Sequence, residues 1–151
     1  MDQDQDQLQN TEDRPYYELG YVSPDQARKL FQNGFNADTD YYFYGSKPRL
    51  WPYKKMREHM WVSKFSEIGT AFRAPVLADA QSWLRKQGLY AEAELAGFDS
   101  EGKPEFSWNV KRAVKFMGQY AIKNTTTDIS FESYEAALSA AIDYALIELD
   151  K

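Results

Sequence analysis

The sequence predicts an α+β fold in which a small antiparallel sheet of three or four strands packs against two or three helices. Three observations favour this class. Segments with apolar residues at helical spacing occur at residues 24–33, 75–87 and 134–149. Segments in which apolar and polar residues alternate lie between the last two. The 151-residue chain is 43% hydrophobic and 27% charged, which is typical of a globular protein.

The first residues differ in composition from the rest. Residues 1–14 are rich in Asp and Gln and contain one Leu, which is too little apolar surface to offset the entropy cost of ordering. We therefore expect a disordered acidic arm at residues 1–14. We assign residues 15–73 to an N-terminal helix, a strand and a basic aromatic segment, and residues 74–151 to an α-β-β-β-α core.

The first helix is predicted at residues 24–33. Ser23 is a good N-cap, Pro24 fits the first turn because its missing N–H costs nothing there, and Gln26 completes a capping box. Gly34 can adopt the left-handed backbone conformation that ends helices.

A strand and an irregular segment are predicted next. Residues 40–44 read Asp-Tyr-Tyr-Phe-Tyr, which is typical of a strand, and Gly45 ends it. Residues 51–72 show no clean apolar period, so we expect irregular structure there with one helical turn near residues 54–60.

The predicted core combines helical spacing at its ends with period-two alternation between them. Its expected elements are a helix at 75–87, strands through 89–95, 106–110 and 116–122, and a helix at 134–149. A turn at 99–103 joins the first two strands, residues 124–127 end the third, and Ser133 caps the last helix. The apolar stripes of these elements are expected to form one cluster: Trp83, Leu84, Phe106, Trp108, Leu138, Ala141 and Ala145.

This order of elements resembles that of the double-stranded-RNA-binding domain. The resemblance implies two helices on one face of a three-stranded sheet. That family holds phosphates with Lys residues at the start of its last helix. Here the segment reads Ser133-Tyr-Glu-Ala-Ala137 beside Glu132, and carboxylates repel phosphate. We therefore retain the topology and not the RNA-binding activity.

Three short motifs carry a second resemblance, which covers most of residues 21–149. They are Ser23-Pro-Asp-Gln-Ala27 with Leu30 and Gly34-Phe35, Ala74-Pro75 with Trp83-Leu84-Arg85, and Tyr134-Glu-Ala-Ala-Leu138. Together they resemble a group of small uncharacterised proteins encoded by phages and prophages of Bacteroides-type gut bacteria. The resemblance implies a phage-borne accessory protein in the bacterial cytoplasm, of a kind that often binds host or defence proteins.

Several function classes find no support in the residues. The chain has no Cys, which excludes disulfides and thiol chemistry. Its single His, His59, follows Glu58, but neighbouring residues on a helix do not face each other. Glu92 and Glu94 share a strand face, which we interpret as the solvent side. We therefore predict no enzyme activity, no catalytic residue, no metal site and no cofactor.

The polar N-terminus and the lack of a long apolar run predict a cytoplasmic protein without membrane contact. The net charge of −5 is unevenly distributed. Residues 47–73 carry seven bases and two acids, whereas residues 125–151 carry six acids and one base. Such a distribution favours charged partners, or an attraction between the basic and the acidic segments of the chain itself. A surface whose charges only interact with solvent is the remaining alternative.

The richest unexplained segment is 41–61, where Tyr, Phe and Trp alternate with Lys and Arg. This composition suits single-stranded nucleic acid, a protein interface, or the core of a small sheet covered by bases. The acidic arm and acidic last helix oppose nucleic acid, so we favour a protein partner from the bacterial host. The predicted partner-binding residues are Tyr44, Trp51, Tyr53, Lys54, Lys55, Arg57 and Trp61. The alternatives are a nucleic-acid-binding accessory protein and a protein that sequesters a small molecule.

Overall fold

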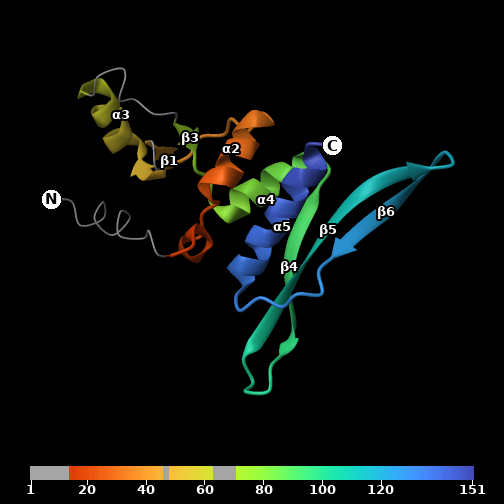
Figure 1. Cartoon of the computed structure of the whole chain (residues 1–151). Helices are drawn as coiled ribbons and strands as arrows, with labels where there is room; N and C mark the ends of the chain where they lie inside the picture. The colour runs from red at the N-terminus through yellow and green to blue at the C-terminus, as the bar shows by residue number, and fades with distance from the viewer. Residues whose placement is uncertain (1–13, 46–47, 63–70) are drawn as a thin grey trace. The chain divides into compact units, whose positions relative to one another are not determined.

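The computed structural model describes residues 14–45, 48–62 and 71–151, and for residues 59–62 it describes the backbone alone. The chain divides into two compact units, residues 1–76 and 77–151 (Figure 1). The described residues form four α-helices, one short 3-10 helix and six strands in two antiparallel sheets. The α+β class is confirmed, with a three-stranded sheet in each unit instead of a single sheet. The expected acidic arm, apart from Arg14, lies outside the described residues.

The first unit contains a three-stranded sheet of order β2-β1-β3. Its elements are η1 (Tyr16–Leu19), α2 (Pro24–Gln32), β1 (Tyr41–Tyr44), β2 (Arg49–Pro52), α3 (Tyr53–Val62) and β3 (Phe72–Arg73).

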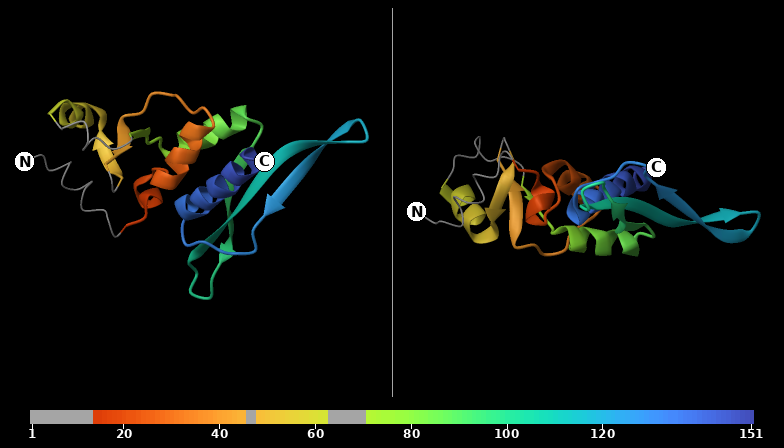
Figure 2. Two further views of the ribbon diagram at one scale, coloured as in Figure 1. Left: turned by 45° about the horizontal axis from the view of Figure 1, so that its top comes forward. Right: turned by 90° about the horizontal axis from the view of Figure 1, so that it is seen from below.

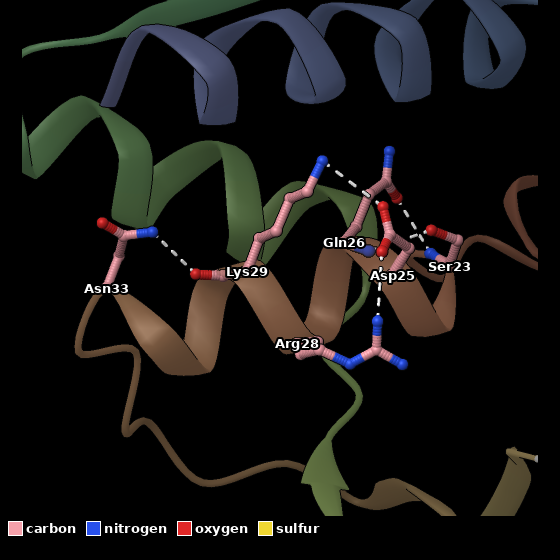
Figure 3. A network of polar contacts seen from close by, with 6 residues as sticks. All are labelled: Ser23, Asp25, Gln26, Arg28, Lys29 and Asn33. Atoms are coloured by element: carbon pink, nitrogen blue, oxygen red, sulfur yellow. Dashed lines mark hydrogen bonds and ion pairs between the residues drawn. The ribbon is translucent and has the colours of Figure 1, made fainter. Parts of the chain in front are cut away.

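Helix α2 confirms the predicted capping box. The Ser23 hydroxyl accepts a hydrogen bond from the Gln26 amide at 3.1 Å, and the Ser23 amide donates to the Gln26 side-chain oxygen at 2.8 Å (Figure 3). Gly34 has a φ of 99°, as expected of the residue that ends the helix. Asp25 forms ion pairs with Arg28 and Lys29 on the exposed side.

The prediction of irregular structure is wrong for residues 51–62, and the helical turn expected near residues 54–60 is part of a longer helix. Residues 49–52 form β2, which pairs with β1, and residues 53–62 form the ten-residue helix α3. The Tyr53 amide donates to the Asp40 carbonyl at 3.0 Å, which fixes the start of α3 beside β1. Strand pairing with β1 and burial of Met56 stabilise a segment whose own apolar pattern is weak.

The second unit has the predicted element order. Its elements are α4 (Leu77–Lys86), β4 (Tyr90–Phe98), β5 (Pro104–Phe116), β6 (Gln119–Thr126) and α5 (Tyr134–Leu149), and the sheet order is β4-β5-β6. The Ser133 hydroxyl caps α5 by accepting from the Ala136 amide at 3.1 Å. Helix α5 lies along β4 and β5, and α4 contacts both β4 and α5 (Figure 2).

The third strand differs from its prediction. Residues 124–126 continue β6 instead of ending it, and β5 extends to Phe116. The turn between the strands is Met117-Gly118, and both residues have positive φ angles, 51° and 81°. This is the backbone signature of a tight two-residue hairpin turn, so the segment 116–122 that was predicted as one strand is divided by a turn.

The core of the second unit is built from one face of α5. Its buried side chains are Ala137, Leu138, Ala141, Ile142, Ala145 and Leu146, together with Leu84 of α4 and Ala91 and Val110 of the sheet. Of the predicted cluster, Leu84, Leu138, Ala141 and Ala145 are confirmed as buried. Trp83, Phe106 and Trp108 are half-buried. The buried stripe therefore consists of small and aliphatic residues that let α5 lie close to the sheet, with aromatic rings at its margin.

Candidate partner-binding surface

The aromatic residues of β1 and β2 lie on two faces of the first sheet. Tyr42 pairs with Trp51 and Phe43 pairs with Leu50. Phe43 and Leu50 are buried, and the Tyr16 ring contacts Phe43 edge-on with 5.0 Å between ring centroids. The Phe43 face therefore contributes to the core of this unit, but the neighbouring Tyr44 on the opposite face is buried as well, so burial does not alternate along β1.

Two predicted site residues on the strands are partly or wholly covered. Tyr44 is only 2% exposed, and its ring meets Trp51 edge-on at 5.8 Å. Tyr44 therefore belongs to the core and presents no surface to a partner. Trp51 is half-buried. The interpretation of alternate aromatics as sheet core, left open from the sequence, applies to Tyr44.

The exposed part of the segment is the first turn and a half of α3. Tyr53 is 45% exposed, Lys54 and Arg57 are exposed, and Lys55 is half-buried. We call the predicted residues with accessible side chains the α3 patch: Trp51, Tyr53, Lys54, Lys55 and Arg57. The remaining predicted residue, Trp61, has its side chain outside the described residues, as does His59.

Tyr53 and Arg57 form an ordered pair within the α3 patch. The Arg57 guanidinium carbon lies 5.8 Å from the centroid of the Tyr53 ring, and an Arg57 N–H donates to the Tyr53 hydroxyl at 3.5 Å. The ring of Tyr42 supports Tyr53 from β1, with 5.4 Å between centroids. Tyr42 was not among the predicted site residues, because its role depends on the β1 pairing that places it beside the start of α3.

The charge distribution of α3 is unfavourable for the helix itself. Its first turn carries Lys54 and Lys55 and no acidic residue, although the N-terminus of a helix has a positive partial charge. Each such cation costs the helix up to about 1 kcal/mol. The same arrangement creates a positive potential beside Tyr53, which attracts an anionic partner.

A hollow of about 480 Å³ in the second unit is a weaker candidate site. Its lining includes Asp99, Lys103, Glu105 and Ser130. Asp99 accepts from the amides of Glu101 and Lys103 in the β4–β5 turn, and Ser130 donates to Glu105 at 3.4 Å. These acids are used by the fold. In the part of the chain that the structure describes, no cluster of His, Cys, Asp or Glu could hold a metal ion.

A second exposed surface escaped the sequence reasoning. The spacing of Phe116, Tyr120 and Ile122 predicted a strand, yet all three are exposed, along with the neighbouring Met117. Period-two spacing indicates a strand but does not reveal whether any element covers it.

Comparison with family models, with curated proteins and with solved structures finds no match to this chain. The resemblances to RNA-binding domains and to phage proteins therefore stay predictions. Among the described residues, no helix has the length and apolar character needed to cross a membrane. Function must be argued from the surfaces themselves.

Proposed function

We propose that the protein is a non-enzymatic, phage-borne accessory protein that binds a host or defence protein in the bacterial cytoplasm through the α3 patch. The observation that carries this proposal is the exposed Tyr53–Arg57 pair, which stands beside Tyr42. The fold buries Phe43, Tyr44 and Met56 to build its core and leaves this pair accessible. The phage origin is supported by the motif resemblance alone.

The α3 patch has the composition of an interface hot spot. Tyr and Arg dominate such sites because they offer large contact areas and directed hydrogen bonds. A guanidinium already placed over a ring loses less freedom when it binds, and its remaining N–H groups match a carboxylate. With Lys54 and Lys55 adjacent, the surface fits an acidic patch on a partner protein.

Nucleic acid and small molecules fit the α3 patch less well. Single strands bind to rows of open aromatic faces, whereas Tyr53 is in contact with Arg57 and Tyr42, and Trp51 is half-buried. A small molecule needs a concave site, and the hollow in the second unit has two of its acids, Asp99 and Glu105, engaged in hydrogen bonds of the fold.

Site-specific photo-crosslinking tests the proposal. A photoreactive phenylalanine replaces Tyr53 in the full chain, which is expressed in its bacterial host and irradiated. The matched control carries the same group at Tyr90 of the second unit, since both tyrosines are 45% exposed. We expect one predominant protein adduct at position 53 that is missing at position 90. The adduct should be lost when Lys54 and Arg57 are changed to Ala.

Three results would contradict the proposal. Equal adducts at the two positions would show that the α3 patch has no preferred partner. Adducts removed by nuclease would replace the protein partner with nucleic acid. An adduct that survives the loss of Lys54 and Arg57 would place the interface elsewhere.

A further inference from the structure

The β5–β6 hairpin extends beyond the sheet of the second unit. Strand β4 pairs with β5 up to Lys111, whereas β6 pairs with β5 up to the hairpin turn, ending with Phe116 opposite Gln119. Residues 112–123 therefore form a two-stranded ribbon, and no other strand of the described part of the chain pairs with it (Figure 1). Five residue pairs, from Arg112↔Lys123 to Phe116↔Gln119, give the β5–β6 ribbon a length of about 17 Å.

Large apolar side chains are exposed at the distal end of the β5–β6 ribbon. The exposed fractions are 71% for Phe116, 87% for Met117, 76% for Tyr120 and 75% for Ile122. Phe116 pairs with Gln119, whereas Tyr120 pairs with Lys115, so the two rings lie on opposite faces of the ribbon. Apolar groups on both faces and at the tip suit a ligand that surrounds the ribbon, such as a groove.

The same segment is strongly basic. Residues 111–124 contain Lys111, Arg112, Lys115 and Lys123 and no acidic residue, in a chain whose net charge is −5. Arg112 lies 3.3 Å from Glu148 of α5. Among the described residues, Lys111 and Lys123 form no ion pair.

Lys123 forms no ion pair among the described residues. It stands directly opposite Arg112 on β5, whose own guanidinium is engaged by Glu148 at 3.3 Å. An anion lying along the β5–β6 ribbon would supply the opposite charge for Lys123.

We propose that the β5–β6 ribbon binds double-stranded DNA by entering the major groove. A two-stranded ribbon fits this groove, which is about 12 Å wide, and it meets phosphates on both walls. Lys115 on β5 and Lys123 on β6 face the two phosphate rows, while Phe116 and Met117 at the tip contact base edges and thymine methyl groups. This inference concerns the second unit and does not depend on the α3 patch.

Other nucleic acids fit this geometry less well. The major groove of double-stranded RNA is deep and too narrow for a ribbon. Single strands are bound by aromatic faces arranged in a row, and here Phe116 and Tyr120 point to opposite sides. An acidic protein surface would contact one face of the ribbon and leave the apolar groups of the other face exposed.

Fluorescence anisotropy of the full chain with a short duplex of random DNA sequence tests the proposal. Lys115 lies over the Tyr120 ring at 5.7 Å from its centroid, and like Lys111 and Lys123 it forms no ion pair among the described residues. With these three lysines contacting phosphates, affinity should fall about 40-fold between roughly 50 and 200 mM salt. Changing Lys115 and Lys123 to Gln should weaken binding. The salt dependence of the affinity should fall by the amount expected for the loss of about two phosphate contacts. The matched control, with Lys54 and Lys55 changed to Gln, should bind DNA as the parent does.

A second variant separates DNA binding from folding. Lys123→Glu reverses the charge opposite Arg112, which already pairs with Glu148, so it should leave the melting temperature nearly unchanged while abolishing DNA binding. Full retention of DNA affinity in this variant, or no binding by the parent at low salt, would overturn the proposal.

Competition with other polyanions tests whether the β5–β6 ribbon prefers a ligand other than duplex DNA. Equal binding of duplex RNA would refute the groove argument, and equal competition by polyglutamate would assign the ribbon to acidic proteins. Crosslinking at Tyr53 should be unchanged in the ribbon variants, so the proposed function and this inference can fail separately.

Discussion

Replacing Ile142 by Ala tests where the core of the second unit lies. Ile142 is fully buried in α5, whereas Ile147 on the same helix is 50% exposed. The two positions share residue type and helix, so Ile147→Ala is a matched control. Both changes gain the same small helix propensity, up to about 0.7 kcal/mol.

The expected magnitudes follow from burial. Ile→Ala removes three carbon groups, which at about 0.8 kcal/mol each amounts to about 2.4 kcal/mol at a buried site. A residual cavity adds to this cost, because the structure around a truncated core side chain relaxes only partially. We expect Ile142→Ala to lower the free energy of unfolding by about 2–4 kcal/mol and Ile147→Ala by less than about 1 kcal/mol.

Urea unfolding monitored by circular dichroism measures both variants. Because the chain has two compact units, hydrogen exchange of the α5 amides provides a reading specific to the second unit. Equal destabilisation by the two substitutions would refute the assignment of the buried stripe to Ala137, Leu138, Ala141, Ile142, Ala145 and Leu146.

Further predictions concern a cap, a buried acid, a turn and the N-terminal arm. Ser23→Ala should lower the free energy of unfolding by about 1 kcal/mol, measured by urea titration, because it removes the capping hydrogen bond to Gln26. The Tyr144 hydroxyl, then Lys151 and Arg112, hold the pKa of Glu148 below its ordinary value of 4.5, although burial opposes them. Glu148 therefore stabilises the fold above pH 4.5, and this stabilisation is lost as pH falls through the lowered pKa. Acid titrations of stability should show a shallower decline for Glu148→Gln than for the parent. Gly118→Ala should destabilise the hairpin by roughly 1 kcal/mol in thermal melts, because its φ of 81° strains any residue with a Cβ. Deleting residues 1–14 should leave the melting temperature unchanged, since one Leu provides almost no apolar surface to pack.

Local signals predicted the elements that they encode directly. The capping box at Ser23 and the cap at Ser133 are determined by side chains within one helical turn, and both are present in the structure. The same holds for the turn at 99–103, where Asp99 binds the amides of Glu101 and Lys103. These features were predictable because their hydrogen bonds join residues close in sequence.

Features that depend on distant pairing were not predictable. β2 and α3 lie in a segment without apolar periodicity, and β2 is held by its register with β1. The predicted buried stripe of α5 consisted of Tyr134, Leu138, Ala141, Ala145 and Leu149. Its three middle residues are buried, whereas Tyr134 is 41% exposed and Leu149 is half-buried. Helix α5 is apolar on most of its surface, so its own pattern does not identify the face that meets the sheet.

For the candidate surfaces too, composition indicates which segment is of interest but not which of its side chains are exposed. Sequence composition located the α3 patch but could not separate Tyr44, which is buried, from Tyr53, which is exposed. For the β5–β6 ribbon, composition was misleading, because alternating apolar residues normally indicate a covered face.

The strand register makes the ribbon a functional candidate. It shows that β4 ends its pairing at Lys111 and that, among the described residues, no strand continues beside the ribbon. A ribbon selected only for stability would place polar groups at its tip, since this reduces exposed apolar area. The combination of Lys115 and Lys123 on the ribbon with exposed Phe116 and Met117 at its tip therefore favours a ligand that supplies negative charge and an apolar contact together, as the major groove of DNA does.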